Sequence, residues 1–93
     1  MELGMIGLGR MGANMVRRLM RGGHKVVVHD IDPKAIERMV AEGAVGAATL
    51  DELVSLLEAP RAVWLMVPAG APTEGMVDAV ASRLAPGDSV IDG

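Results

Sequence analysis

Residues 2–12 read ELGMIGLGRMG, a short apolar run that leads directly into a glycine-rich turn. The run Glu2–Ile6 is short and ends at a glycine, which predicts a buried strand rather than a helix. The turn has the spacing G-x-G-x-x-G at Gly7, Gly9 and Gly12. In a strand, turn and helix unit, the first glycine makes the tight turn, the second lets the backbone approach a pyrophosphate, and the third lets helix and strand pack closely. The pattern therefore predicts a dinucleotide-binding turn.

A helix and a second strand follow the turn with the periods that such a unit requires. Apolar residues recur on one helical face over 11–20, and the glycine pair 22–23 ends the helix. The β-branched run KVVVHD, residues 25–30, predicts a central parallel strand covered on both faces. It closes on Asp30, 18 positions after Gly12 (30 − 12 = 18), where the acidic residue of a dinucleotide fingerprint is expected. The predicted apolar helical face comprises Met11, Met15, Val16, Leu19 and Met20.

The expected ligand of this turn is NAD. The backbone amides of Arg10 and Met11 would lie at the helix N-terminus, where they and the helix dipole attract a pyrophosphate. Asp30 can accept hydrogen bonds from the adenosine ribose hydroxyls, and its charge repels the additional 2′-phosphate of NADP. Arg10 or Lys34 could lie close enough to offset that repulsion, so NADP stays possible. The predicted cofactor residues of this half of the site are Gly7, Leu8, Gly9, Arg10, Met11, Gly12, Asp30 and Ile31.

Simpler interpretations of the same residues stay open. The glycines could form a tight turn that binds no ligand. Asp30 could cap a helix or lie in solvent without touching a ribose.

Strand and helix patterns alternate along the rest of the chain. Asp32 before Pro33 and the capping box of Thr49 with Glu52 mark helix starts. The patterns predict helices over 33–42, 49–57 and 73–84, and strands over 44–47, 62–67 and 89–92. This alternation predicts an α/β fold, a doubly wound parallel sheet of the Rossmann type with right-handed crossovers in three α/β/α layers.

A second loop is expected to flank the ligand crevice. In a doubly wound sheet the strand order reverses beside the first strand, so the loops after the first and fourth strands face each other across the crevice. The fourth-strand loop contains Val67, Pro68 and Ala69, followed by Gly70. We expect it to lie against the nicotinamide half of the cofactor, whose ring Met11 could also touch. The plainer interpretation is a turn between strand and helix.

Composition narrows the function classes. The 93 residues form at most one domain, and 51% of them are hydrophobic, as in ordinary globular chains. The chain has no cysteine, and neither histidine has a second ligand at a metal-binding spacing, so no metal site is predicted. A net charge of −3 and a single aromatic residue, Trp64, argue against nucleic acid as a partner. No apolar run is long enough to cross a membrane, and a cytoplasmic location is expected.

Four segments carry a family resemblance: GLGRMGANM, GGHKVVVHDIDP, RAVWLMVPAG and PGDSVIDG. They are similar to the N-terminal domain of the decarboxylating 6-phosphogluconate dehydrogenases, above all to their shorter, NAD-linked branch, and more distantly to the 3-hydroxyisobutyrate dehydrogenases. The resemblance covers the entire chain. Many NADP-linked members have Asn-Arg in place of Asp30 and Ile31, and alanine in place of Gly9. Both differences imply NAD as the cofactor.

The resemblance implies an enzyme larger than this chain. Such an enzyme oxidises 6-phosphogluconate, loses CO₂ from the resulting β-keto acid and yields ribulose 5-phosphate in the pentose phosphate pathway. Its substrate motif would begin at Gly93, and its lysine base and glutamate acid would follow on a helical domain that forms homodimers. Residues 1–93 are then a truncated dinucleotide-binding domain, with no catalytic residue and no activity alone.

Other functions fit the same residues. The nearest is the cofactor domain of a 3-hydroxyisobutyrate-type β-hydroxyacid dehydrogenase, which would act on a different small acid. A stand-alone nucleotide-sensing module is an alternative of another class, because the cofactor site looks complete. FAD or S-adenosylmethionine fits the fourth-strand loop less well than a nicotinamide does.

Overall fold

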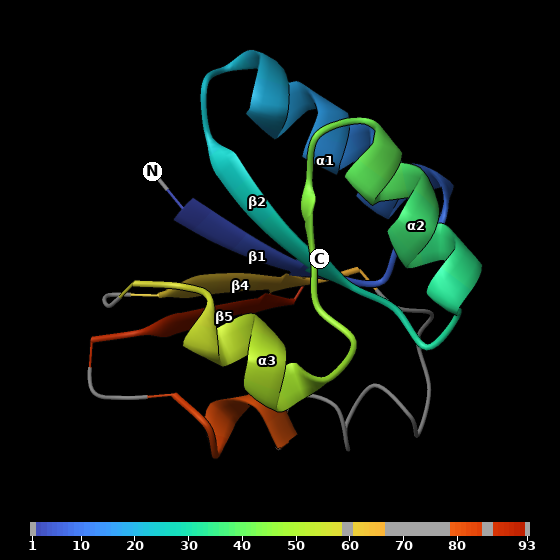
Figure 1. Cartoon of the computed structure of the whole chain (residues 1–93). Helices are drawn as coiled ribbons and strands as arrows, with labels where there is room; N and C mark the ends of the chain where they lie inside the picture. The colour runs from blue at the N-terminus through green and yellow to red at the C-terminus, as the bar shows by residue number, and fades with distance from the viewer. Residues whose placement is uncertain (1, 59–60, 67–78, 85–86, 93) are drawn as a thin grey trace.

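The chain folds into a parallel sheet with helices on both faces (Figure 1). The computed structural model of the chain describes residues 2–58, 61–66, 79–84 and 87–92. The strands are β1 (Glu2–Ile6), β2 (Lys25–His29), β3 (Val45–Gly46), β4 (Ala62–Leu65) and β5 (Ser89–Asp92). The helices are α1 (Arg10–Arg21), α2 (Pro33–Ala41) and α3 (Leu50–Ser55), and residues 79–81 are also helical.

The strand order reverses at β1, in the middle of the sheet. The order is β3-β2-β1-β4-β5, and every pair is parallel. Gly4 of β1 lies beside Val27 of β2 on one side and beside Val63 of β4 on the other. Because the carboxyl ends of parallel strands meet at one edge, the reversal places the ligand crevice of such sheets just beyond β1. The doubly wound α/β sheet of the Rossmann type is confirmed.

The sheet separates two apolar cores, which gives the three predicted layers. On one face, Met5 and Val28 pack with residues of α1 and α2, among them Met39. On the opposite face, Val27 packs with Leu53 of α3. Side chains alternate along β2, as they must in a strand that is covered on both sides. Figure 1 shows α1 and α2 together on one side of the sheet and α3 on the other.

Two of the helices begin at the residues that the capping signals predict. The Asp32 carboxylate accepts the backbone N–H of Lys34 at 3.0 Å, and Pro33 occupies the first helical position of α2. The Thr49 hydroxyl accepts the backbone N–H of Glu52 at 3.1 Å and so caps α3. These short-range contacts explain why the helix starts could be located from the sequence.

The predicted strands and helices are slightly too long at their ends. The second strand stops at His29 because Asp30 turns its carboxylate toward backbone N–H groups outside the sheet. Of the helix predicted over 73–84, only 79–84 is described. The other shortened elements are α2, predicted to reach Glu42, β3, predicted over 44–47, α3, predicted to reach Leu57, and β4, predicted to reach Val67.

Met11 does not share the buried face of α1, which is a correction to the predicted helical stripe. Its side chain is 72% exposed, whereas Val16 one turn later is fully buried against the sheet. The first turn of α1 lies at the carboxyl edge of the sheet, where Met11 borders a surface groove together with Met66, the residue after β4. Periodicity identifies the face of a helix but not the point at which the sheet beneath it ends.

Candidate dinucleotide site

Gly7 makes the turn that ends β1. Its φ of 95° lies in the left-handed region, which side chains other than glycine rarely adopt. Its backbone N–H donates to the carbonyl of His29 at 3.0 Å, so the turn stays attached to the end of β2. The chain then reverses into α1 at the centre of the carboxyl edge of the sheet.

Gly12 permits the close contact between α1 and this turn. A Cβ at Gly12 would lie 2.1 Å from the carbonyl oxygen of Gly7, a distance that no side chain can occupy. The obstacle is backbone, which cannot rotate away as a side chain could. The structure therefore supplies the packing reason that the sequence motif predicts for its third glycine.

Gly9 has no comparable reason within the protein to be glycine. Its φ of −66° is open to any residue, and a Cβ there would meet no atom within 4 Å. The open space lies at the N-terminus of α1, where the first backbone N–H groups have no partner in the helix. A cofactor phosphate that approaches the backbone would need this space, so the residue fits the proposed role of the second glycine.

The N-terminus of α1 is electrostatically open to an anion. Gly9 is the N-cap and provides no side chain to satisfy the helix amides, and the first turn contains no acidic residue. The positive end of the helix dipole is therefore not offset locally, and Arg10 adds a positive charge in an exposed position.

Asp30 is fixed against the glycine turn by two backbone hydrogen bonds. One carboxylate oxygen accepts the N–H of Leu8 at 2.6 Å, and the other accepts the N–H of Asp32 at 2.9 Å. The side chain of Leu8 is buried in the core, so its backbone N–H is committed to Asp30. Asp32, not Asp30, caps α2, which removes the helix-capping interpretation of Asp30. Each carboxylate oxygen retains a lone pair that can accept a hydroxyl.

A groove of about 400 Å³ opens between α1 and α2 beside this turn. One of its arginines, Arg17, forms a fork-shaped ion pair with Glu42, with nitrogen to oxygen distances of 2.7 and 2.9 Å. The Glu42 carboxylate raises the pKa of Arg17, and the Arg17 guanidinium lowers the pKa of Glu42. The lining residues are Leu8, Gly9, Arg10, Ala13, Asn14, Arg17, Ala35, Arg38 and Met39.

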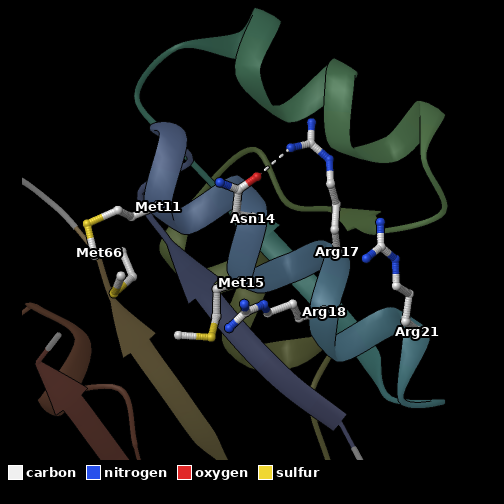
Figure 2. Close-up of a pocket in the computed structure, with 7 residues that line it drawn as sticks. All are labelled: Met11, Asn14, Met15, Arg17, Arg18, Arg21 and Met66. Atoms are coloured by element: carbon white, nitrogen blue, oxygen red, sulfur yellow. Dashed lines mark hydrogen bonds between the residues drawn. The ribbon is translucent and has the colours of Figure 1, made fainter.

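A second groove, of about 370 Å³, lies along the other side of α1 (Figure 2). Met11 and Met66 border the end of this groove that is nearest the glycine turn. Arg17 lines this groove as well, and Figure 2 shows its side chain extending toward α2, with Asn14 accepting one of its N–H groups at 3.0 Å. One end of the groove thus lies where the nicotinamide half of a cofactor is expected. From there the groove runs along α1, past Met15 and Arg18 to Arg21.

The remaining predicted site residues divide into two groups. Ile31 directly follows Asp30 and is 89% exposed, so its apolar side chain lies free at the mouth of the site. Val67, Pro68 and Ala69 lie outside the described residues, and their predicted position against the nicotinamide stays a prediction.

Sequence reasoning missed His29 and Arg38. His29 is 8% exposed, and its Nδ1 lies 2.9 Å from the carbonyl oxygen of Ala47, which joins the end of β2 to the residue after β3. Arg38 borders the groove because α1 and α2 lie side by side on the sheet. Both relationships depend on strand order, and no local pattern signals them. Within the described ranges, no group of carboxylates and histidines is arranged to hold a metal ion, and no helix is long and apolar enough to span a membrane.

The sequence matches one family over nearly its whole length. The profile of the NAD binding domain of 6-phosphogluconate dehydrogenase matches residues 2–93. The chain belongs to this family. The resemblance seen in the four sequence segments is thereby confirmed.

Individual relatives agree with this assignment. The NAD⁺-dependent, decarboxylating 6-phosphogluconate dehydrogenase of Haloferax volcanii is 40% identical over 93 residues, which are 100% of this chain and 31% of that protein. The structure of Plasmodium falciparum 6-phosphogluconate dehydrogenase, determined in its apo form and in complexes with NADP⁺ and with 6-phosphogluconate, matches with a TM-score of 0.91 at 27% identity, over 100% of this chain and 21% of that one. Mycobacterium tuberculosis 3-hydroxyisobutyrate dehydrogenase matches with a TM-score of 0.86 at 28% identity, over 98% of this chain and 30% of that one. The chain thus spans less than a third of each of these proteins.

Proposed function

We propose that this chain binds NAD across the carboxyl edge of the sheet, with the pyrophosphate at the N-terminus of α1. The observation that carries the proposal is the 2.6 Å hydrogen bond from Leu8 N–H to Asp30, because it holds a carboxylate beside the glycine turn. Pyrophosphate binding at the turn and ribose recognition by the acid are thereby combined in one site. NAD fits the residues here, since Gly9 leaves open space and α1 leaves its first amides free.

Each residue has a separate part in holding the cofactor. Gly7, Gly9 and Gly12 shape the turn, and the backbone amides of Arg10 and Met11 face the phosphates. Leu8 orients Asp30, which accepts the adenosine ribose hydroxyls. The exposed Ile31 provides an apolar surface for the adenine. Val67, Pro68 and Ala69 complete the nicotinamide side.

NAD supplies hydride acceptance when it is bound, and this chain supplies binding and orientation. The charge of Asp30 disfavours the 2′-phosphate of NADP, so the domain prefers NAD.

The complete protein is proposed to be a cytoplasmic, homodimeric oxidoreductase that converts 6-phosphogluconate to ribulose 5-phosphate and CO₂. The family assignment supports this activity, and the NAD⁺-dependent name of the Haloferax volcanii relative supports the cofactor. The base, the acid and the phosphosugar contacts then belong to the part of the enzyme outside residues 1–93. Residues 1–93 bind cofactor but do not turn over substrate.

A 3-hydroxyisobutyrate-type activity is the second candidate, because a dehydrogenase of that name has the same fold with a TM-score of 0.86. The two activities are separated by assaying the full-length enzyme with NAD and either 6-phosphogluconate or 3-hydroxyisobutyrate. Turnover of the first with release of CO₂ is expected. Turnover of the second alone would contradict the proposal.

The cofactor class is tested with a ligand panel on residues 1–93. Because a ligand that binds the native state stabilises it, NADH should raise the unfolding temperature, while FAD and S-adenosylmethionine should leave it unchanged. A shift with FAD or S-adenosylmethionine and none with NADH would show that the turn serves another cofactor. No shift with any of them would favour a purely structural turn.

A further inference from the structure

Two arginines without ion-pair partners border the groove between α1 and α2. Arg10 is the first residue of α1, and Arg38 lies in the last turn of α2. In the described part of the chain, no carboxylate pairs with either guanidinium. Arg17 borders the same groove, but Glu42 already neutralises it. Two uncompensated positive charges therefore face one groove.

The described residues that line the groove include no aspartate or glutamate. Asn14 adds an amide, Leu8 and Gly9 form the wall at the glycine turn, and Ala35 leaves room on the side of α2. Guanidinium groups suit a phosphate monoester because they donate several N–H groups in a planar fork.

The groove adjoins the position proposed for the adenosine ribose. Leu8 lines the groove with one part of its surface and donates its N–H to Asp30. A ribose whose hydroxyls contact Asp30 would lie at the Leu8 end of the groove, and a substituent on its 2′-oxygen would be open to the groove that Arg10 and Arg38 line. The carboxylate repels a phosphate there and the guanidiniums attract it.

We propose that this groove is a phosphate-monoester subsite in which Arg10 and Arg38 receive the 2′-phosphate of NADP(H). The inference rests on the proposed dinucleotide binding at the glycine turn and goes beyond it by naming what limits cofactor selectivity. Asp30 makes NAD the preferred cofactor, while the two arginines allow NADP to bind with lower affinity.

Arg38, and not Lys34, is the cation of α2 that acts in this subsite. The sequence alone suggested Arg10 or Lys34 as the residue that offsets the charge of Asp30. Lys34 is absent from the groove lining, and its backbone N–H is bound to the Asp32 cap at the start of α2. Arg38 lies one helical turn further along, on the side of α2 that faces α1.

Calorimetric titration of residues 1–93 with NADPH and with NADH tests the assignment. Arg38→Gln is expected to weaken the binding of NADPH about five- to tenfold, because a charge-assisted contact in an open groove is lost. The affinity for NADH should change less than about twofold. Arg10→Gln is expected to weaken the binding of NADPH by a similar factor. It should also weaken the binding of NADH slightly, because Arg10 is the first residue of α1, where the pyrophosphate is proposed to bind. Lys34→Gln and Arg21→Gln remove one charge from the same helices outside this groove and should leave the ratio of the two affinities unchanged. Unfolding temperatures establish that each variant folds.

Two further measurements identify the source of the phosphate. Adenosine 2′,5′-bisphosphate should displace NADPH from the wild type more strongly than 5′-AMP does, and Arg38→Gln should remove that difference. Raising the salt concentration should weaken NADPH more than NADH because the groove is open to solvent. If inorganic phosphate or 6-phosphogluconate binds in an Arg38-dependent manner while the NADPH to NADH ratio does not depend on Arg38, the 2′-phosphate assignment is wrong.

The titrations distinguish failure of the phosphate subsite from failure of dinucleotide binding at the glycine turn. If the wild type binds NADH but the NADPH affinity is the same in Arg38→Gln, only the subsite is refuted. A wild type that binds neither nucleotide contradicts the proposed function itself, and the subsite is refuted with it.

Discussion

The Asp30 carboxylate accepts the backbone N–H of Leu8 at 2.6 Å and so joins the end of β2 to the turn that follows β1. The proposed ribose acceptor is thus also part of the framework of the pyrophosphate turn. Loss of the carboxylate would leave a partly buried N–H without its partner, which makes Asp30 more than a replaceable specificity residue. Recognition of the ribose and the shape of the glycine turn are coupled through one side chain.

Asp30→Ala should therefore change both stability and cofactor binding. Urea unfolding is expected to show a loss of about 1–3 kcal/mol from the unsatisfied Leu8 N–H. Calorimetry should show weaker NADH binding and a smaller preference for NADH over NADPH. Asp32→Ala is the matched control, because it removes a neighbouring carboxylate and the α2 cap, at about 1 kcal/mol, but leaves the Leu8 contact intact. A preference for NADH that survives Asp30→Ala would show that another residue reads the ribose.

The third position of the glycine motif can be compared with the second by alanine substitution. Gly12→Ala places a Cβ 2.1 Å from the Gly7 carbonyl oxygen and should destabilise the chain by more than about 2 kcal/mol. Gly9→Ala meets no protein atom and should change stability by less than about 0.5 kcal/mol. Its added methyl enters the space proposed for the phosphates, so NADH affinity should fall about fivefold, or about 1 kcal/mol. Unfolding and titration of both variants separate the packing role from the binding role, and equal losses of stability would contradict this division.

The Arg17 and Glu42 pair predicts a pH-dependent contribution to stability. Arg17 lowers the pKa of Glu42 in the folded state below its ordinary value of 4.5, so the pair stabilises the fold above that pH and loses its effect as the pH falls through the lowered pKa. Glu42→Gln should be less stable than the wild type near neutral pH, and the difference should shrink below pH 4.5. Because both side chains are well exposed, added salt should also reduce the difference. A difference that is constant with pH would exclude the ion pair as its cause.

Substitution of Asp88, the residue before β5, is predicted to cost more stability than substitution of an exposed carboxylate. Its side chain is fully buried, and it accepts the Arg61 backbone N–H at 2.5 Å and a guanidinium N–H at 3.2 Å. Arg61 also donates its Nε to the carbonyls of Val54 and Leu57 at the end of α3. Asp88→Ala would leave a partly buried arginine uncompensated and should cost about 3 kcal/mol or more in urea unfolding. Asp51→Ala is the control, because Asp51 forms an exposed ion pair with Arg83. Its loss should reduce the free energy of unfolding much less.

Local signals predicted most of the sheet and the centre of the site. The Gly7, Gly9 and Gly12 spacing and the caps at Asp32 and Thr49 are read within a few residues, so their positions follow from the sequence. The alternation of strand and helix patterns predicted a doubly wound sheet, in which the strand order reverses beside the first strand. These features depend on residues that are close together in the sequence, and they are determined by backbone geometry and burial.

Contacts between distant segments could not be predicted in the same way. The bond between His29 and Ala47, the groove position of Arg38 and the pairing of Arg61 with Asp88 arise only after strands and helices are placed side by side. Met11 follows the same rule, since its exposure depends on where the sheet ends beneath α1. The sequence therefore indicated Asp30 and Arg10, which belong to the local motif, but not Arg38, which borders the groove only because α1 and α2 lie side by side.

The most direct test of the central claim is calorimetric titration of residues 1–93 with NADH, with Gly9→Ala as the binding-site variant. The account predicts that NADH binds at one site per chain, more tightly than NADPH, and that Gly9→Ala weakens it while the unfolding temperature stays the same. Absence of heat and of thermal stabilisation with NADH, in a chain that is folded, would contradict the account and leave the glycine turn with a structural role only.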